Sequence, residues 1–380
     1  MMTMFFITIF WLYAIFVGLL IVGWNKSSAV VANDDPGFDP FVSIIVAARN
    51  ESSRIPELLR NLSSQRNVNF EVIVVDDQSE DDTVLVIKAF GKTDQRFKVI
   101  SNDGTGKKSA ITTGVGKATG SIIVTTDADC QVGPSWVHNI CTAFGDPRIM
   151  MVFGGVRMKG DSFFDKLQKQ EFASLMGSAA AAAGLGQPVM CNGANLSFRR
   201  TAFLEVEGYQ GNMEIASGDD EFLMRKIIAR YPDSVCFAHN SQTVVTTVTN
   251  SSVNQLLNQR LRWAGKWRKH NGIVSTTIAL FVFIFQLSTL IIITLTLFHS
   301  INAVICVSLL SVKMMLEFVF LQKVNRFLNI RFNVWAFLTL QLLYPLYVCT
   351  IGVLCNFMGF EWKGRPHAKS QRINVRETSN

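Results

Sequence analysis

The chain has 380 residues, a formal net charge of +7, a hydrophobic content of 49% and a charged content of only 17%. This composition is too apolar and too poor in charge for an ordinary soluble protein. Charged residues are absent from 1–25, 271–312 and 332–360, whereas the segment between the first two has an ordinary charge content. We therefore predict one extramembrane domain attached to membrane segments.

Basic residues gather beside the apolar runs, at 260–269, 323–331 and 363–376. This placement favours contact with anionic lipid and a positive-inside orientation, and it argues against nucleic-acid binding. The seven cysteines include no Cys-x-x-Cys pair, which predicts reduced thiols that serve as small apolar side chains.

Residues 1–25 form the first apolar run, which is long enough to cross a bilayer. The run has no basic n-region and no clear cleavage site, so we expect a retained transmembrane anchor and no cleaved signal. Lys26 follows it, which weakly predicts that the next segment is cytosolic. A polar linker with Pro36 and Pro40 leads into the domain.

Residues 41–250 alternate between strand-like and helix-like patterns, which predicts an α/β domain with a doubly wound, mostly parallel sheet. The expected strands cover residues 41–47, 70–75 and 97–100, a strand that begins at Ile122, and 150–156. The expected helices cover residues 52–65, 81–90, 163–183 and 222–230, with one more that begins near Lys107. In such sheets ligands bind at the carboxyl ends of the strands.

Two acidic residues, Asp127 and Asp129, follow the strand that begins at Ile122. Two carboxylates at this spacing can share one hard cation, and oxygen ligands suit Mg²⁺ or Mn²⁺ bound together with a substrate diphosphate. Taken alone, the pattern is more often an acidic helix cap beside an unrelated solvated neighbour.

Two further acidic positions have similar alternatives. Asp76 and Asp77 follow the strand 70–75, where a carboxylate can accept hydrogen bonds from a nucleobase or a ribose, or can instead cap the next helix. Asp220 comes just before the helix 222–230. It could take a proton from an attacking hydroxyl, or Asp219 and Asp220 could simply begin that helix.

Residues 251–271 are predicted to form an amphipathic helix that lies in the membrane interface. Gln259, Arg262 and Trp263 share one face of this helix because their spacing is i, i+3 and i+4. Arginine can bind a phosphate through two hydrogen bonds, and tryptophan can stack on a sugar or a base. The alternative is a basic interfacial helix with a tryptophan anchor.

Taken together, these motifs resemble the membrane-integrated family 2 glycosyltransferases over about residues 42–365. The matching motifs, in chain order, are Ala48-Arg49-Asn50-Glu51, Val75-Asp76-Asp77, Asp127-x-Asp129, Gly218-Asp219-Asp220, Gln259-x-x-Arg262-Trp263 and a closing Trp362-Lys363-Gly364-Arg365. The first five of these motifs, in register, are a strong resemblance, although each one alone is weak. The resemblance implies a GT-A fold for the α/β domain.

The resemblance also implies roles for individual residues. Asp77, together with Asp76, would contact the uridine of the donor, and Glu51, Lys108 and Asp127 would complete the nucleotide-sugar site. Asp127 and Asp129 would hold the diphosphate and a divalent metal, Mg²⁺ or Mn²⁺. Asp220 would be the general base, and the residues Gln259, Arg262 and Trp263 would bind the diphosphate or the acceptor.

The chain departs from the large polymer synthases of this family, because it enters the membrane almost directly after the Gln-x-x-Arg-Trp motif. Its size and layout are similar to those of ceramide glucosyltransferases and carotenoid-ester glycosyltransferases. We therefore expect an inverting hexosyl- or N-acetylhexosaminyltransferase that moves a sugar from a UDP-sugar to a lipid hydroxyl at the cytosolic face of the cell membrane. The alternatives are a processive polysaccharide synthase and a catalytically silent membrane partner of an export complex.

The C-terminal apolar region, residues 272–360, contains three candidate spans, and residues 361–380 form a basic tail. The middle candidate carries Lys313 and Glu317, which are costly in lipid unless they are paired or face protein. Three spans after a cytosolic domain would leave the basic tail outside the cell, against the positive-inside rule. We therefore expect a cytosolic tail and one re-entrant or interfacial segment, and Pro345 makes 332–357 a candidate for that segment.

Overall fold

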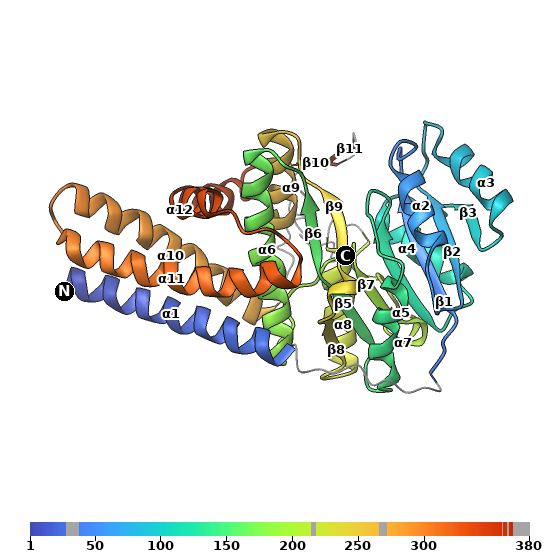
Figure 1. Cartoon of the computed structure of the whole chain (residues 1–380), viewed down its shortest axis with the longest axis horizontal. Helices are drawn as coiled ribbons and strands as arrows, with labels where there is room; N and C mark the ends of the chain where they lie inside the picture. Colours follow the sequence, from blue (N-terminus) through green and yellow to red (C-terminus); the bar gives the residue numbers. More distant parts are fainter. Residues whose placement is uncertain (28–37, 214–217, 266–271, 359, 363–364, 368–380) are drawn as a thin grey trace, which may run out of the picture.

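The computed structural model describes residues 1–27, 38–213, 218–265, 272–358, 360–362 and 365–367. It consists of an α/β domain built on a seven-stranded sheet and a bundle of long apolar helices beside it (Figure 1). Residues 266–271, which belong to the predicted interfacial helix, and residues 368–380 of the predicted tail lie outside the described residues, as do residues 363–364 of the closing motif.

The central sheet has the strand order β3-β2-β1-β4-β7-β5-β8. Its strands are β1 (Val42–Ala48), β2 (Phe70–Asp76), β3 (Phe97–Ser101), β4 (Ile122–Asp127), β5 (Met151–Gly154), β7 (Leu196–Arg199) and β8 (Val235–Ala238). Strands β1 to β4 are parallel, whereas β7 runs antiparallel to both of its neighbours. The prediction of a mostly parallel doubly wound sheet is therefore confirmed. The central strands consist largely of β-branched residues that are buried on both faces, as parallel sheets require.

The predicted strand 150–156 is divided in two by Gly154 and Gly155. A side chain at Gly154 would have its Cβ only 2.3 Å from the Asn195 amide, so glycine at this position lets the chain pass close to Asn195. Beyond it the chain leaves the sheet as β6 (Val156–Lys159), which pairs with β9 (Val245–Val248) in a separate two-stranded sheet. A third small sheet pairs β10 (Phe360–Trp362) with β11 (Arg365–His367).

Shorter helices of the α/β domain connect these strands. They are α2 (Ile55–Ser63), α3 (Thr83–Thr93), α4 (Lys107–Lys117), α5 (Trp136–Cys141), α7 (Arg200–Glu205) and α8 (Asp219–Arg230), with 3₁₀ turns at Thr142–Gly145 and Ser241–Thr243. Helix α2 buries Ile55, Leu58, Leu59 and Leu62, whose spacing places them on one face. Because β1 pairs in parallel with both β2 and β4, the carboxyl ends of these three strands lie together.

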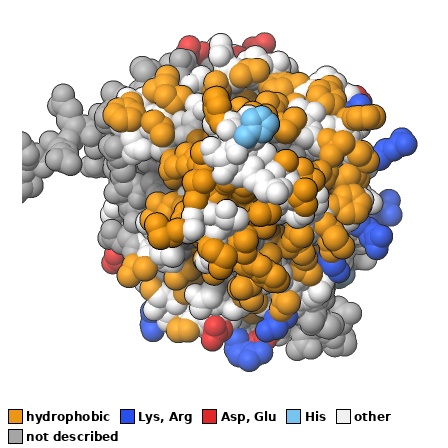
Figure 2. Space-filling model, turned by 90° about the vertical axis from the view of Figure 1, so that its left-hand side faces the viewer, with side chains coloured by type: hydrophobic (Ala, Val, Ile, Leu, Met, Phe, Trp, Pro, Cys, Tyr) orange, Lys and Arg blue, Asp and Glu red, His pale blue; other side chains and the backbone are white. Residues whose placement is uncertain are grey.

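Four helices within the described residues are long and apolar enough to cross a membrane. They are α1 (Met2–Ser27), α10 (Ile273–Leu297), α11 (Ala303–Phe327) and α12 (Val334–Leu354). Viewed from the end away from the sheet, the bundle is largely covered by hydrophobic side chains, with basic groups at its periphery (Figure 2). This surface suits a lipid environment.

Helices α1, α10 and α11 run side by side, whereas α12 is seen nearly end-on next to α6 (Phe163–Gly184) (Figure 1). The connection from α10 to α11 lies at the end of the bundle away from the sheet, so α11 returns to the side of the α/β domain. Helix α12, which contains Pro345, is thus the candidate span whose direction differs from that of the other three. The expectation that one C-terminal apolar segment is re-entrant or interfacial stays a prediction.

The two charged residues of α11 are paired inside the protein, as the sequence requires. Lys313 lies 3.0 Å from Glu317 and donates a hydrogen bond to Gln341 of α12 at 2.7 Å. Glu317 also accepts a 2.6 Å hydrogen bond from Tyr13 of α1. These contacts join α1, α11 and α12 and remove the cost of a lone charge in lipid.

Helix α6 belongs to both parts of the molecule. Its alanine-rich end packs closely against α1, where a Cβ on Gly184 would lie 2.0 Å from the carbonyl oxygen of Gly23. Small residues therefore let the two helix backbones approach each other. The other end of α6 begins with a capping box of Ser162 and Asp165, next to the helix α9 (Val253–Ala264), which carries the Gln-x-x-Arg-Trp motif.

Candidate active site

One cavity of about 1010 Å³ lies between the carboxyl edge of the sheet and the helical bundle. Its lining includes eight residues for which the sequence analysis proposed a role, namely Glu51, Asp77, Asp127, Asp129, Asp220, Gln259, Arg262 and Trp263. The structure therefore brings together side chains that are separated by up to about 200 positions in the sequence. Asp76 and Lys108, which were also predicted, are not part of this lining.

Asp77 is fixed at one end of the cavity by the loop that precedes α4. Its carboxylate accepts 2.8 Å hydrogen bonds from the Asn102 side chain and from the backbone N–H of Gly106, and its carbonyl oxygen accepts one from Arg49 at 3.0 Å. Asp76, by contrast, accepts hydrogen bonds from the backbone N–H of Ser79 at 3.3 Å. Asp77 therefore faces the cavity, while Asp76 stabilises the turn that follows β2.

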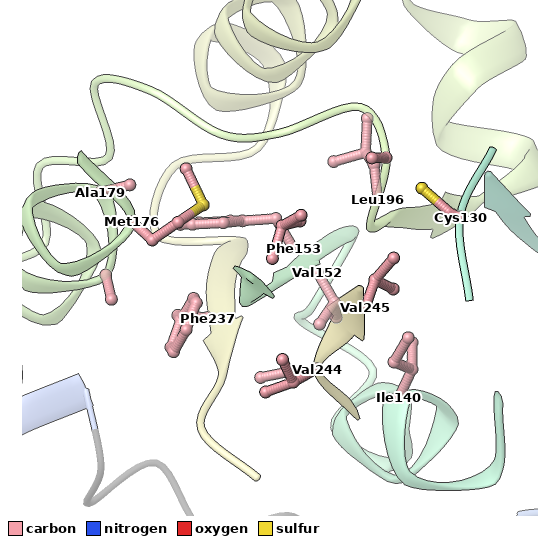
Figure 3. Packing of buried hydrophobic residues seen from close by; sticks show 14 of the residues in the cluster. Cys130, Ile140, Val152, Phe153, Met176, Ala179, Leu196, Phe237, Val244 and Val245 are labelled. Carbon is pink, nitrogen blue, oxygen red and sulfur yellow. The ribbon is translucent and has the colours of Figure 1, made fainter. Parts of the chain in front are cut away.

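Asp127 and Asp129 lie at the end of β4, and their carboxylate oxygens and the Cys130 sulfur lie within 4.8 Å of one another. Cys130 is buried among hydrophobic residues on the side of Leu196 (Figure 3). Burial, reinforced by the charges of Asp127 and Asp129, raises the pKa of its thiol well above the usual value. The two carboxylates offer oxygen donors that would fit a hard cation such as Mg²⁺ or Mn²⁺, whereas a thiol suits softer metals.

Lys107 is a site residue that the sequence analysis missed. Its ammonium lies 2.6 Å from Asp127 and 3.4 Å from Asp219. Burial favours the neutral amine, but the charges of Asp127 and Asp219 outweigh burial and raise the pKa of Lys107. This residue therefore stays positively charged in the middle of the acidic group.

The assignment of Lys108 to the nucleotide is not supported by its position. Lys108 is buried, donates a 2.6 Å hydrogen bond to the carbonyl oxygen of Asn212, and lies over the Phe222 ring at 4.8 Å. Adjacent residues of a helix point about 100° apart, so only one of the two lysines can face the acids. The sequence offered no signal that distinguished Lys107 from Lys108.

Asp219 and Asp220 are the first two residues of α8, and the helix cap is Gly218, whose φ of +82° suits glycine. Asp220 accepts hydrogen bonds from the backbone N–H groups of Gly193 at 3.0 Å and Glu221 at 2.8 Å. A Cβ on Gly193 would lie 3.1 Å from both Asp219 and Lys107. Glycine in the turn 191–195 therefore lets the two acids and the lysine lie close together.

Helix α9 supplies the opposite wall of the cavity. Burial lowers the pKa of the Arg262 guanidinium, while the charges of Asp219, Asp127 and Asp220 act in the opposite direction. Arg262 therefore lies within electrostatic reach of the acidic group. Of the other two motif residues, Trp263 lies 6.0 Å from the Phe172 ring of α6, and Gln259 accepts a 3.1 Å hydrogen bond from Asn250 in the loop before α9.

The arrangement thus combines oxygen donors for a divalent cation, two cationic side chains beside them, and a carboxylate positioned by backbone N–H groups. Such a set can hold a diphosphate and take a proton from an attacking group. The far end of the same cavity is lined by the apolar residues Phe172, Leu175, Met176, Ile278, Ala279 and Ile351 of the helical bundle.

Residues 43–206 match the model of glycosyl transferase family 2. The chain is 29% identical over 234 residues to a beta-monoglucosyldiacylglycerol synthase of Trichormus variabilis, covering 59% of this chain and 48% of that protein. It is 24% identical over 269 residues to a poly-beta-1,6-N-acetyl-D-glucosamine synthase of Staphylococcus aureus, covering 68% and 62%. The matched regions thus span 48% and 62% of the length of these two curated relatives.

Among solved structures, the fold is similar to that of the mannosyltransferase PcManGT of Pyrobaculum calidifontis, solved in complex with GDP-mannose and Mn²⁺. The TM-score is 0.57 at 19% identity, and the match covers 94% of this chain and 100% of that one. This likeness supports the fold and includes the apolar helices. Residues 43–206 are therefore a glycosyl transferase family 2 region with a GT-A fold, joined to helices that could span a membrane.

Proposed function

We propose that this chain is an inverting, metal-dependent glycosyltransferase that moves one sugar from a UDP-sugar to a lipid hydroxyl at the cytosolic face of the cell membrane. The observation that carries the proposal is the continuity of the cavity. Its lining runs from Asp77 at the sheet edge to Ile351 on α12. A polar donor and an apolar acceptor can therefore meet in one space.

The donor would occupy the end formed by the sheet. Asp77 and Glu51 would contact the nucleoside, and Lys107 takes the place that we first assigned to Lys108. Mg²⁺ or Mn²⁺, bound by Asp127 and Asp129, would neutralise the charge of the diphosphate. Lys107 and Arg262 lie beside these acids and would bind the diphosphate oxygens directly.

Asp220 would act as the general base on the acceptor hydroxyl. Its carboxylate is held by two backbone N–H groups, whereas Asp219 is paired with Lys107, so Asp220 is the better candidate of the two. Removal of the proton frees the oxygen to attack the anomeric carbon as the bond to the diphosphate breaks. Direct attack on the side opposite the leaving group inverts the configuration.

The acceptor end of the cavity supports a lipid. Its apolar lining comes from α6, α10 and α12, which lie next to the bilayer if the long helices span it. The two relatives differ in the product for which they are named, which is a glycolipid for one and a polysaccharide for the other. The lining of this chain favours the glycolipid class, and Trp263 and Gln259 would contact the acceptor headgroup.

The test uses full-length protein in lipid nanodiscs with Mn²⁺, offered UDP-glucose, UDP-N-acetylglucosamine or GDP-mannose. GDP-mannose is included because PcManGT was solved with it. We expect release of the nucleoside diphosphate together with a lipid that is heavier by one sugar, detected by mass spectrometry. A ladder of products would indicate a processive synthase, and no nucleotide release with any donor would indicate a silent membrane partner.

A further inference from the structure

Arg260 is a buried charged residue to which the site described above assigns no role. Its side chain is only 3% exposed, and it forms an ion pair with Glu171 of α6 that includes a 3.2 Å hydrogen bond from its Nε. The hydroxyl of Tyr347, on α12, donates a 3.4 Å hydrogen bond to the same carboxylate. We call these three residues the Arg260 cluster. It joins α9 to α6 and α12.

The guanidinium of Arg260 also contacts two residues of the predicted motif. It donates a 2.6 Å hydrogen bond to the side-chain oxygen of Gln259 and lies 4.3 Å from the centre of the Trp263 ring. Both partners line the cavity. The cluster therefore ends on the surface that we assign to the acceptor.

A contribution to stability alone does not explain well why Arg260 and Glu171 form a buried ion pair. Desolvation of two charges offsets most of their attraction, and apolar residues of similar volume often stabilise a protein equally well. A planar guanidinium with fixed partners can, however, hold neighbouring side chains in one geometry. Here it holds an amide and an indole that line the same cavity as Arg262 and its acids.

We propose that Arg260, held by Glu171 and Tyr347, is a positioning residue that orients Trp263 and Gln259 toward the acceptor. The proposal rests on the proposed function, because it assigns these two residues to the acceptor side. It divides the motif into a donor side at Arg262 and an acceptor side at Gln259 and Trp263. It also makes the acceptor site depend on the packing of α6 and α12 against α9.

The experiment compares Glu171→Gln, Arg260→Gln and the double variant of both. Each single change leaves a buried charge without its partner, so we expect the unfolding midpoint to fall by roughly 6 °C or more. The double variant removes both charges and should lie within about 3 °C of the wild type. These midpoints report the structural role of the pair.

Kinetics of the double variant then test the positioning role. We expect the acceptor KM to rise by about tenfold or more, because a lost positioning contact weakens acceptor binding. The donor KM and the slow release of nucleotide without acceptor should stay within about twofold of wild type, since Arg262 and the acids are unchanged. Arg148→Gln, which breaks the exposed ion pair with Asp146, should leave every value unchanged.

The outcomes separate the two proposals. A double variant that recovers both its stability and a wild-type acceptor KM would show that the pair is only a structural link, and the inference would be wrong. A rise of the donor KM equal to that of the acceptor KM would also contradict it. A wild-type protein that transfers no sugar to any lipid would count against the proposed function, and the acceptor KM is then measured on whichever glycan it modifies.

Discussion

Replacing Lys107 by methionine tests whether this lysine shares Asp127 with a divalent cation. The change keeps the length of the side chain and removes its charge, which lies 2.6 Å from Asp127 and 3.4 Å from Asp219. Two unit charges at such separations interact by about 5–6 kcal/mol at an effective dielectric constant of about 20. The Asp127 side chain is 40% exposed, so we reduce this to about 1–2 kcal/mol for screening by water.

Two affinities should therefore change in opposite directions. Without the competing ammonium, bare Mn²⁺ should bind the acids about tenfold more tightly, since about 1.4 kcal/mol corresponds to a factor of ten. The donor diphosphate loses a cationic partner and should bind about tenfold more weakly. Electron paramagnetic resonance of free Mn²⁺ measures the first affinity, and calorimetry with UDP at saturating Mn²⁺ measures the second.

Lys108→Met is the matched control. This change removes the buried hydrogen bond to Asn212, so it should lower the unfolding midpoint but leave the Mn²⁺ affinity unaltered. If Lys107→Met leaves both affinities unchanged, or shifts them in the same direction, Lys107 does not act between the acids and the diphosphate. A change in Mn²⁺ affinity with Lys108→Met alone would restore the original assignment.

Three further predictions concern the acids and the α9 motif. Asp220→Asn should lower the turnover of transfer by about 10²-fold or more at nearly constant UDP affinity. If the UDP affinity falls as much as the turnover, Asp220 is a binding residue, and Asp219 should then be tested as the general base. Treatment with EDTA should stop transfer, and Mn²⁺ or Mg²⁺ should restore it. Asp129→Ala should weaken UDP binding, because the diphosphate loses its metal bridge. Full activity in chelated, metal-free protein would refute the assignment of Asp127 and Asp129 as metal ligands. Arg262→Lys keeps the charge but loses the planar guanidinium and should lose most transfer, and near-normal activity of both this variant and Trp263→Phe would leave α9 as a membrane anchor only.

The parts of the fold that could be predicted are those with strong local patterns. Strands β1, β2 and β4 are largely runs of buried β-branched residues. The observed bounds of β1 and β2 differ from the predicted ones by one residue, and β4 begins at Ile122 as predicted. Strand β7 was not predicted, because its four residues show no periodicity and its antiparallel partners lie far away in the chain. The prediction of a single strand at 150–156 overlooked that two adjacent glycines let the chain change sheets.

In the candidate site too, residues with a local sequence pattern could be predicted, and contacts between distant residues could not. Acidic residues at strand ends and at the start of a helix could be recognised because their position follows from the secondary structure. The pairing of Arg260 with Glu171 could not, since 89 positions separate them and each residue alone resembles an ordinary charged residue on a helix surface. The choice between Lys107 and Lys108 depended on the rotation of one helix, which the packing of α4 against the sheet determines.

The last prediction concerns the side of the membrane on which the C-terminal tail lies. Helices α1, α10 and α11 are seen from the side in Figure 1, whereas α12 is seen nearly end-on, so we expect α12 to stay on the side of the α/β domain and the basic tail to be cytosolic. We expect Ser379→Cys, in a chain whose seven cysteines are replaced by serine or alanine, to react with a membrane-impermeant maleimide only after the cells are permeabilised.

The control for this experiment is His299→Cys in the connection between α10 and α11. That connection lies at the opposite end of the bundle, so the new thiol should react in intact cells. Reaction of Ser379→Cys in intact cells would contradict the cytosolic tail and would make α12 a fourth span. Protection of both thiols in intact cells would instead mean that α10 and α11 form a hairpin that does not reach the far side.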